Sequence, residues 1–398
     1  MFIPKEYILL KQPATRFLCA TFLAGNITMI QWICAPYVLT SPVNLHILLY
    51  NITQMPVNRA FQTIMQSSTE INVRDIFDMK NEQNFEFLAL KTFQHQAKHC
   101  LIYEEYISLR NITVESVENI TQIPSLPVEF FKSERIKTGA FSPAKIFASS
   151  TTTGAIPSHH HVKDLSIYEQ SFLTCFKSVY GDPSDYVILG LLPSYLERPD
   201  SSLVYMVEKL ILFSKHDESG FFLDNYEALY ERLQSLKNLK KRFLLFGVTF
   251  ALVDFANAFP IDLSGNIVVE TGGMKGRQKE ITRAELHDLL REKFNLTSVH
   301  SEYGMTELLS QGYSKGNGIF FPSDTMRILL REEDDPFAVH DCEMKMITGI
   351  INVIDLANIY SCSFIATEDA GKLYPDGSFE VTGRVDHSDI RGCSLMVV

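Results

Sequence analysis

The chain has 398 residues, of which 46% are hydrophobic and 21% are charged, and its formal net charge is −11 at pH 7. This length and balance predict a globular protein with a large core, built as two lobes or as one large α/β domain with appendages. Because no basic stripe offsets the acidity, the composition excludes a general nucleic-acid binder, and we expect no nucleic-acid partner.

The cysteines indicate the compartment. There are seven, they are scattered along the chain, and no two form a C-x-x-C pair. An odd, scattered set is not typical of a disulfide framework or of a structural zinc site. The pattern indicates a reducing compartment, and the cytoplasm is the expected location.

Residues 1–70 differ from the rest of the chain. From Phe17 to Leu39 they are mostly apolar, and basic residues precede this stretch. The segment is either a signal peptide or anchor, interrupted by polar residues, or an extension that lies before the natural start. Membrane contact is expected only if the apolar stretch is a real anchor. We therefore expect an N-terminal extension over 1–70 and one folded domain over 71–398.

From residue 71 onward, apolar residues recur at helix and strand spacing. The expected helices are 85–106, 164–180, 204–213, 226–239 and 282–294, the last with a capping box at Thr282 and Glu285. The expected strands are 144–148, 186–192, 242–252, 267–270, 326–331 and 349–355. This alternation predicts an α/β fold of layered sheets and helices, with ligands at the loops beyond the strand ends.

A run of hydroxyl residues and a glycine follows the first of these strands: Ser149, Ser150, Thr151, Thr152, Thr153 and Gly154. In a turn, its backbone N–H groups and hydroxyls can converge on phosphate oxygens, and the glycine permits a close approach. The run lacks the Walker pattern. A low-complexity surface turn is the alternative interpretation.

Two later segments contain residues suited to a nucleotide. Glu270-Thr271-Gly272-Gly273 follows a strand and exposes backbone groups, although a solvated turn explains it equally well. The segment 300–307 contains Tyr303, which can stack on a base, and Thr306, which can bond a phosphate or carboxylate oxygen. It ends at Glu307, a carboxylate that can hold magnesium.

A third segment is an expected hairpin with its turn at Pro375-Asp376-Gly377. Asp369 precedes the hairpin and Arg384 follows it, so the two side chains can meet on one side. A carboxylate in this place suits a ribose diol. Alone, the segment is an ordinary hairpin.

Taken in order, these motifs resemble the adenylate-forming (ANL) enzyme superfamily: the Ser/Thr/Gly loop, Tyr303-Gly-Met-Thr-Glu307, Thr367-x-Asp369 and Gly383-Arg384-x-Asp386. Residues 71–398 are similar to one branch, the acyl-protein synthetase (LuxE) family, through the strings at 123–132, 270–273, 300–308 and 391–394. The resemblance implies the fold of the large N-terminal domain of these enzymes. Since only residues 387–398 follow Asp386, the small C-terminal domain and its catalytic lysine are expected to be essentially absent.

The same resemblance implies a ligase that uses ATP and magnesium to activate a long-chain fatty acid as an acyl-adenylate, and then transfers the acyl group to a protein cysteine. An acyl reductase or acyltransferase is the implied protein partner. Residues 149–154 would then bind the phosphates of ATP, while residues 270–273 and Tyr303 would flank the adenine. Thr306 would contact the α-phosphate or the acyl carboxylate. Glu307 would bind magnesium, and the Asp369 and Arg384 side chains would hold the ribose.

Cys393 is the position to which the family's acyl-carrying cysteine corresponds, and the neighbouring Arg391 would favour its thiolate. Cys362 is the rival acceptor, but its apolar surroundings are typical of an inert buried thiol. A third alternative is that neither cysteine is acylated and the acyl group goes to an external thiol.

The chain also departs from the superfamily pattern. Thr151 replaces a glycine of the loop, and Pro157-Ser158 replaces the usual proline-lysine. The triplet His159-His160-His161 follows, either in a surface loop or with His160 facing the nucleotide. Two other functions therefore stay open: a ligase that delivers to coenzyme A or a carrier protein, and a non-catalytic nucleotide- or acyl-binding homologue.

Overall fold

The computed structural model describes residues 7–12, 16–23, 26–33, 71–79, 82–150, 156–192, 198–222, 225–272, 282–342 and 344–385. The chain divides into two units, Met1–Ile71 and Asn72–Val398. In the first unit, β1 (Tyr7–Gln12), β2 (Arg16–Leu23) and β3 (Asn26–Ile33) form an antiparallel sheet. Within the ranges given above, no helix is long and apolar enough to span a membrane.

The second unit contains helices and strands throughout. Its helices are α3 (Val73–Phe77), α4 (Glu82–His99), α5 (Leu101–Leu109), α6 (Phe130–Ser133), α7 (Leu165–Tyr180), α8 (Ser202–Ser214), α9 (Tyr226–Asn238), α10 (Thr249–Ala258) and α11 (Arg283–Phe294). Short 3-10 turns are η1 (Val114–Ser116), η2 (Ile120–Gln122), η3 (Pro183–Asp185) and η4 (Leu356–Asn358). The strands are β4 (Leu126–Pro127), β5 (Lys145–Ala148), β6 (His159–Val162), β7 (Val187–Leu191), β8 (Gly220–Phe221), β9 (Phe243–Val248), β10 (Ile267–Thr271), β11 (His300–Tyr303), β12 (Gly312–Ser314), β13 (Ile319–Pro322), β14 (Met326–Arg331), β15 (Val339–His340), β16 (Ile347–Asp355), β17 (Phe364–Leu373) and β18 (Phe379–Arg384).

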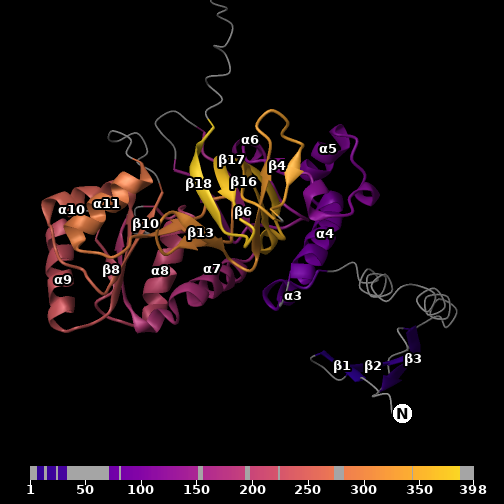
Figure 1. Cartoon of the computed structure of the whole chain (residues 1–398). Helices are drawn as coiled ribbons and strands as arrows, with labels where there is room; N and C mark the ends of the chain where they lie inside the picture. The colour runs from indigo at the N-terminus through magenta and orange to yellow at the C-terminus, as the bar shows by residue number, and fades with distance from the viewer. Residues whose placement is uncertain are drawn as a thin grey trace, which may run out of the picture. The chain divides into compact units, whose positions relative to one another are not determined.

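One large sheet joins a parallel half to an antiparallel half (Figure 1). Strands β8, β7, β9, β10 and β11 are parallel neighbours in that order. The sheet then continues antiparallel through β12, β13, β18, β17, β16, β14 and β15. Because parallel strands end at the same edge, the segments after β10 and β11 lie together, which is where α/β sheets bind ligands. The predicted α/β architecture is confirmed.

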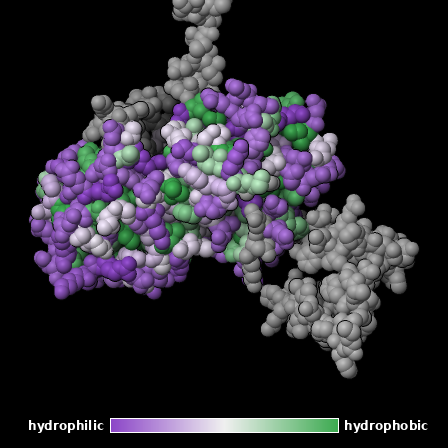
Figure 2. Space-filling model, in the orientation of Figure 1, coloured by the Kyte–Doolittle hydropathy of each residue, from purple (hydrophilic) through white to green (hydrophobic). Residues whose placement is uncertain are grey.

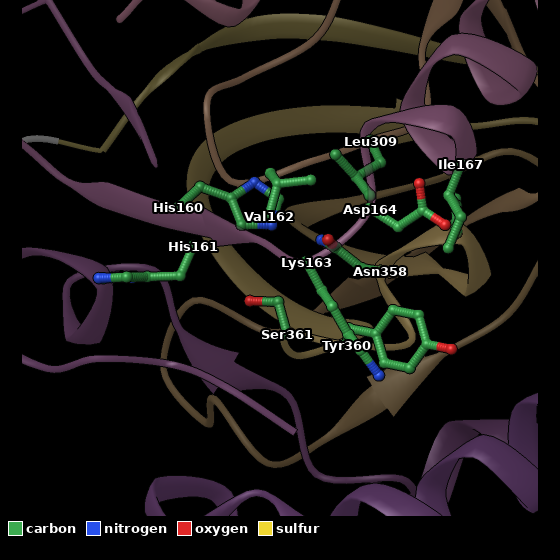
Figure 3. A pocket seen from close by; sticks show the side chains of 11 residues that line it. His160, His161, Val162, Lys163, Asp164, Ile167, Leu309, Asn358, Tyr360 and Ser361 are labelled. Carbon is green, nitrogen blue, oxygen red and sulfur yellow. The ribbon is translucent and has the colours of Figure 1, made fainter. Parts of the chain in front are cut away.

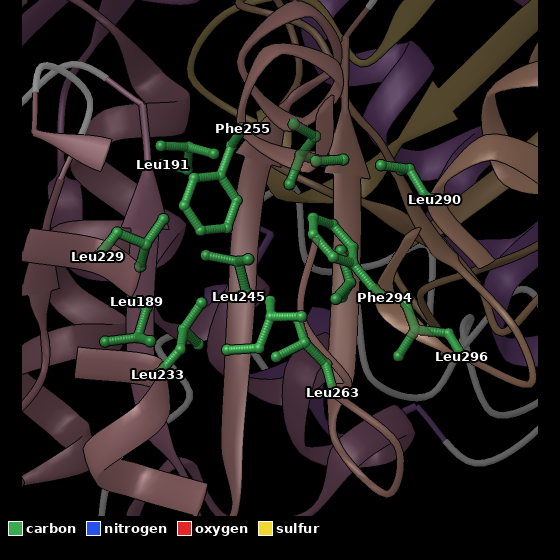
Figure 4. Close-up of a cluster of buried hydrophobic side chains, with 14 of the residues drawn as sticks. Leu189, Leu191, Leu229, Leu233, Leu245, Phe255, Leu263, Leu290, Phe294 and Leu296 are labelled. Atoms are coloured by element: carbon green, nitrogen blue, oxygen red, sulfur yellow. The ribbon is translucent and has the colours of Figure 1, made fainter. Parts of the chain in front are cut away.

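Helices cover both faces of the parallel half. On one face, Leu189 of β7 and Leu245 of β9 pack with Leu233 of α9, Phe255 of α10 and Phe294 of α11, all of them fully buried (Figure 4). On the other face, α8 packs against β7 so closely that a Cβ at Gly190 would lie 3.4 Å from Val207 Cγ1. Burial of large apolar side chains on this scale is the dominant stabilising term of such a domain.

The outer surface is mixed in polarity. On the face shown in Figure 2, hydrophobic residues form scattered spots among hydrophilic ones. Isolated exposed hydrophobic side chains are normal on a folded protein and need no partner.

Two local predictions are confirmed in detail. Thr282 caps α11, its hydroxyl accepting from the Glu285 N–H while the Glu285 carboxylate accepts from the Thr282 N–H. The hairpin of β17 and β18 turns where predicted, at Gly377, whose φ of +79° suits glycine. Both features depend on residues close together in the sequence.

The strand expected over 242–252 is wrong beyond Val248, because β9 ends there and α10 begins at Thr249. The cause lies at Gly247, where a Cβ would approach Leu252 Cγ to 2.5 Å. The chain therefore folds the second half of this apolar run back over the strand. A run of apolar residues has no period that separates a buried strand from a buried helix.

The surface loop considered for the histidine triplet is also wrong. His159, His160 and His161 belong to β6, which pairs antiparallel with β5. His160 is opposite Phe147 and fully buried, and its ring lies edge-on to Phe131. His160 thus lies in the interior of the domain, as do the two residues that follow it in β6.

Candidate active site

The hydroxyl-rich segment connects β5 to β6. Its two ends are joined by hydrogen bonds, since the Ser149 N–H donates to the Ser158 carbonyl (3.1 Å) and the Ser158 N–H donates to Ser149 Oγ (2.9 Å). Ser150 is exposed. Thr151, Thr152, Thr153 and Gly154 lie outside the described residues. The predicted phosphate loop is therefore closed at its base.

Thr306 and Glu307 lie next to this base. The buried Ser158 side chain lies near the Glu307 carboxylate, and His160 Nδ1 on the adjoining strand contacts the Thr306 carbonyl at 2.8 Å. Glu307 is only 4% exposed, and this burial raises its pKa, although the Ser158 side chain opposes the shift. Two predicted groups that are far apart in the sequence thus meet.

The predicted ribose contacts also lie together. The Tyr303 hydroxyl donates to Asp369 Oδ2 (3.1 Å), and Asp369 is directly opposite Arg384 across β17 and β18. Burial raises the pKa of Asp369, while the nearby Arg384 charge and the Tyr303 bond oppose the shift. The direct ion pair of Arg384 is with Glu368 (2.9 Å).

The segment predicted to flank the adenine begins inside the protein. The Glu270 carboxylate is nearly buried, with Oε1 3.6 Å from Arg283 Nε and 3.7 Å from His287 Nε2. Thr271 and Gly272 continue toward the strand end, where Gly272 has a φ of +75°. Gly273 lies outside the described residues. Glu270 therefore faces Arg283 and His287 inside the domain.

Sequence reasoning missed Glu302. Its Oε2 accepts from Thr271 Oγ1 (2.7 Å), which ties the ends of β10 and β11 together. Burial, with a smaller contribution from the Glu270 charge, raises the pKa of Glu302 to about 7. Its position directly before Tyr303 was the only available signal.

Asn358 was missed as well. Its Nδ2 donates to the Glu307 carbonyl (2.6 Å) from η4, more than fifty positions later in the chain. Asn358 and His160 line the small cavity shown in Figure 3. No local motif marks an asparagine that acts over such a separation.

A second cavity of about 960 Å³ lies between α5 and the antiparallel strands. Tyr106, Leu109, Arg331 and Phe337 are among its lining residues. No predicted site residue of the described ranges lines it. Its lining also includes Glu368, which precedes Asp369 in the sequence and pairs with Arg384.

The two cysteine candidates differ. Cys362 is fully buried, its Sγ contacts the Phe364 carbonyl at 3.4 Å, and burial raises the pKa of its thiol well above the ordinary value. These features suit an inert thiol, because the thiolate is the reactive form. Cys393 lies outside the described residues.

The residues around Glu307 fit a magnesium ion that is shared with a substrate. No cluster of three or more metal-binding side chains occurs among the residues for which coordinates are described. Magnesium commonly takes one or two protein carboxylates and completes its shell with phosphates and water. Glu307 is a carboxylate whose charged form is disfavoured by burial, so a cation beside it would relieve that cost.

Acidification is expected to destabilise the domain through His160. Burial lowers the pKa of His160 from 6.5 to about 4, so below pH 6.5 the unfolded chain binds a proton there that the native protein does not. The free energy of unfolding should therefore fall between pH 6.5 and 4, by about 3 kcal/mol in total from this group. Urea unfolding at several pH values checks this. His160→Asn should flatten the dependence, and an unchanged slope would contradict the assignment.

The acyl-protein synthetase, LuxE family matches residues 52–398. A long-chain-fatty-acid–luciferin-component ligase from Aliivibrio fischeri is 22% identical over 369 residues, which are 83% of this chain and 93% of that protein.

The fold is also similar to that of 2-hydroxyisobutyryl-CoA ligase in complex with 2-HIB-AMP and CoA. Its open conformation matches with a TM-score of 0.55 and 8% identity, over 77% of this chain and 75% of that chain. Its thioesterification state matches with a TM-score of 0.55 and 11% identity, over 77% and 68%. At this identity the likeness shows the fold alone. The family match covers most of the chain, and the protein therefore belongs to the acyl-protein synthetase (LuxE) family.

Proposed function

We propose that this protein is an ATP-dependent long-chain fatty acid ligase that forms an acyl-adenylate and then transfers the acyl group to a protein cysteine. The observation that carries the proposal is the contact between the strand that follows the hydroxyl loop and the segment of Thr306 and Glu307, where His160 Nδ1 lies 2.8 Å from the Thr306 carbonyl oxygen. Membership of the family and the substrate named for the Aliivibrio fischeri ligase support it.

In the first step, a carboxylate oxygen of the fatty acid attacks the α-phosphorus of ATP. The bond from that phosphorus to the bridging β-phosphate oxygen breaks, and pyrophosphate leaves with its electron pair. Because two anions must meet, donors fixed in advance lower the barrier most. The loop 149–154 would hold the phosphates, and the Thr306 hydroxyl would donate to the α-phosphate or the acyl carboxylate.

Glu307 would hold magnesium against the phosphates, where the ion neutralises charge. Tyr303 and the strand end at Thr271–Gly273 would flank the adenine. Asp369, held by the Tyr303 hydroxyl, would accept from the ribose hydroxyls beside Arg384. With these roles, the nucleotide would lie beside Thr271 of β10, Tyr303 of β11 and Asp369 of β17.

In the second step, the thiolate of Cys393 would attack the acyl carbonyl carbon. A thioester bond forms, the bond from the carbonyl carbon to the adenylate oxygen breaks, and AMP leaves. The adenylate is a good leaving group, and a thiolate is a strong nucleophile. An acyl reductase or acyltransferase is the class of protein that would then take the acyl group.

Asp369→Ala is expected to remove the preference for a ribose diol. The wild type should use ATP better than 2′,3′-dideoxy-ATP by about 10-fold or more, because a hydrogen bond to a charged group contributes about 1.5–3 kcal/mol. The variant should use the two nucleotides almost equally. Pyrophosphate release with each nucleotide measures this. Glu380→Gln, whose carboxylate on β18 pairs with Lys372, is the control and should keep the preference. A preference that survives in Asp369→Ala would remove Asp369 from the ribose site.

The proposal is tested with ATP, magnesium and a labelled long-chain fatty acid. Pyrophosphate together with hydroxylamine-labile label on the protein is the expected result. Label that appears only on added coenzyme A would replace the protein acceptor by a small thiol. Absence of pyrophosphate with every chain length would contradict catalysis altogether.

A further inference from the structure

The backbone that carries Thr306 and Glu307 is held by side chains from two other parts of the chain. His160 of β6 contacts the Thr306 carbonyl at 2.8 Å, and Asn358 of η4 donates to the Glu307 carbonyl at 2.6 Å. His160 is 0% exposed and Asn358 is 1% exposed. The carbonyl groups of two consecutive residues are thus held, one by a residue earlier in the chain and one by a residue later in the chain. These carbonyls belong to the same residues whose side chains are proposed to act in catalysis.

The C-terminal side of this segment is fixed as well. Asp355, at the end of β16, accepts from the Leu309 N–H (2.7 Å) and the Ser310 N–H (3.0 Å), and its other oxygen accepts from Ser310 Oγ (2.6 Å). Asp355 also caps η4 by accepting from the Ala357 N–H. The same short turn therefore anchors the segment through Asp355 at one point and Asn358 at another.

The turn that supplies these contacts is itself rigidly held. Gln96 of α4, fully buried, donates to the carbonyls of Asn358 and Ile359, both at 3.1 Å. Its Oε1 accepts from the Ser363 N–H (2.9 Å). An asparagine on such a support has a defined position, which is what second-layer hydrogen bonding needs to orient a reactive group.

The chemistry of the His160 contact defines a tautomer. A carbonyl oxygen only accepts, so Nδ1 carries the proton and donates to Thr306. Nε2 then bears a lone pair, and in this buried position the ring is neutral. The imidazole N–H of His160 and the amide N–H of Asn358 are therefore both uncharged donors.

We propose that His160 and Asn358 are positioning residues that set the direction of the Thr306 hydroxyl and the Glu307 carboxylate for adenylation. The inference rests on the proposed function. Neither residue needs to touch the substrate. Each acts through one backbone carbonyl, and a shift of about 1 Å in a catalytic group can cost about 100-fold in rate.

The test compares three variants of the full-length protein. His160→Leu removes the donor, His160→Asn keeps an N–H near the position of Nδ1, and His161→Leu removes the neighbouring buried histidine, which makes no described bond to the segment 306–307. We expect His160→Leu to lower kcat for fatty-acid-dependent pyrophosphate release by about 10-fold or more and to raise the magnesium concentration for half-maximal rate. His160→Asn should recover most of both, and His161→Leu should match the wild type in both.

Asn358→Asp provides the second measurement, because it is isosteric and replaces the donor to the Glu307 carbonyl by an oxygen. It should raise the magnesium requirement in the same direction as His160→Leu. If His160→Leu or Asn358→Asp is poorly folded, the fraction of active protein falls. The magnesium concentration that the remaining active protein needs for half-maximal rate still measures how well Glu307 binds the ion. A merely structural role would leave that requirement unchanged.

The outcomes separate two failures. If the wild type releases pyrophosphate and His160→Leu behaves as His161→Leu in rate and magnesium requirement, the positioning role is wrong and the proposed function stands. If the wild type releases no pyrophosphate with any fatty acid, the proposed function is wrong, and with it the role proposed for these residues.

Discussion

Glu307→Gln should reduce fatty-acid-dependent pyrophosphate release by about 100-fold or more while leaving the protein folded. The substitution keeps the size of the side chain and an oxygen that can accept from Ser158, but it removes the charge that would bind magnesium. Loss of one preorganised electrostatic contact in a buried site commonly costs 100- to 1,000-fold, on the order of 3–4 kcal/mol. Because burial disfavours the ionised carboxylate, the neutral amide should be tolerated well by the fold.

Glu129→Gln is the matched control. Burial and the neighbouring Glu368 also raise the pKa of the Glu129 carboxyl, yet Glu129 belongs to no proposed contact with ATP or acid. Its variant should release pyrophosphate at the wild-type rate. Circular dichroism and thermal unfolding of both variants show whether the fold is kept. Full activity in Glu307→Gln would remove Glu307 from the magnesium site.

Cys393→Ser should abolish the covalent acyl label while sparing the first turnover of pyrophosphate. A serine hydroxyl at neutral pH is a far weaker nucleophile than a thiol that is partly ionised. Adenylation precedes the transfer of the acyl group and does not need the thiol. Pyrophosphate release and covalent labelling should therefore respond differently to this substitution. The label is measured by gel or mass spectrometry after reaction with labelled fatty acid, and its thioester nature by hydroxylamine.

Cys362→Ser is the control, since the thiol of Cys362 is fully buried and its pKa is raised. The label should persist in this variant. If the label instead persists in Cys393→Ser and disappears in Cys362→Ser, the acceptor is reassigned. Pyrophosphate release by the wild type without any label on the protein would transfer the acceptor role to an external thiol.

The parts of the fold that could be predicted are those with local causes. The capping box at Thr282 and Glu285 and the turn at Gly377 depend on a few neighbouring residues. The helix over α7 begins after its capping residue Asp164 and ends before Gly181, as the sequence indicates. Such signals act within one or two turns of chain.

The parts that could not be predicted depend on distant packing. The end of β9 is set by Leu252 folding back on Gly247, which an unbroken apolar run does not show. The burial of His160 is set by its strand partner Phe147 and by Thr306, which is 146 positions away. Polar residues that follow a loop ending in glycine are typical of a solvent-exposed segment, and the sequence alone does not show that the fold buries them.

The candidate site shows the same division. Motif order brought residues 149–154, Thr306 and Glu307 into one hypothesis, and in the structure His160, on the strand after that loop, contacts the Thr306 carbonyl. The supporting contacts of Asn358 and Glu302 have no motif. They follow from the meeting of η4 with the segment after β11 and from the register of β10 with β11.

The most direct test of the central claim is ATP–pyrophosphate exchange in the purified protein. Labelled pyrophosphate should enter ATP only when ATP, magnesium and a long-chain fatty acid are all present, because exchange requires reversible formation of the acyl-adenylate. Exchange should persist in Cys393→Ser and be lost in Glu307→Gln. Absence of acid-dependent exchange in the wild type, across a series of chain lengths, would contradict adenylation as the function of this protein.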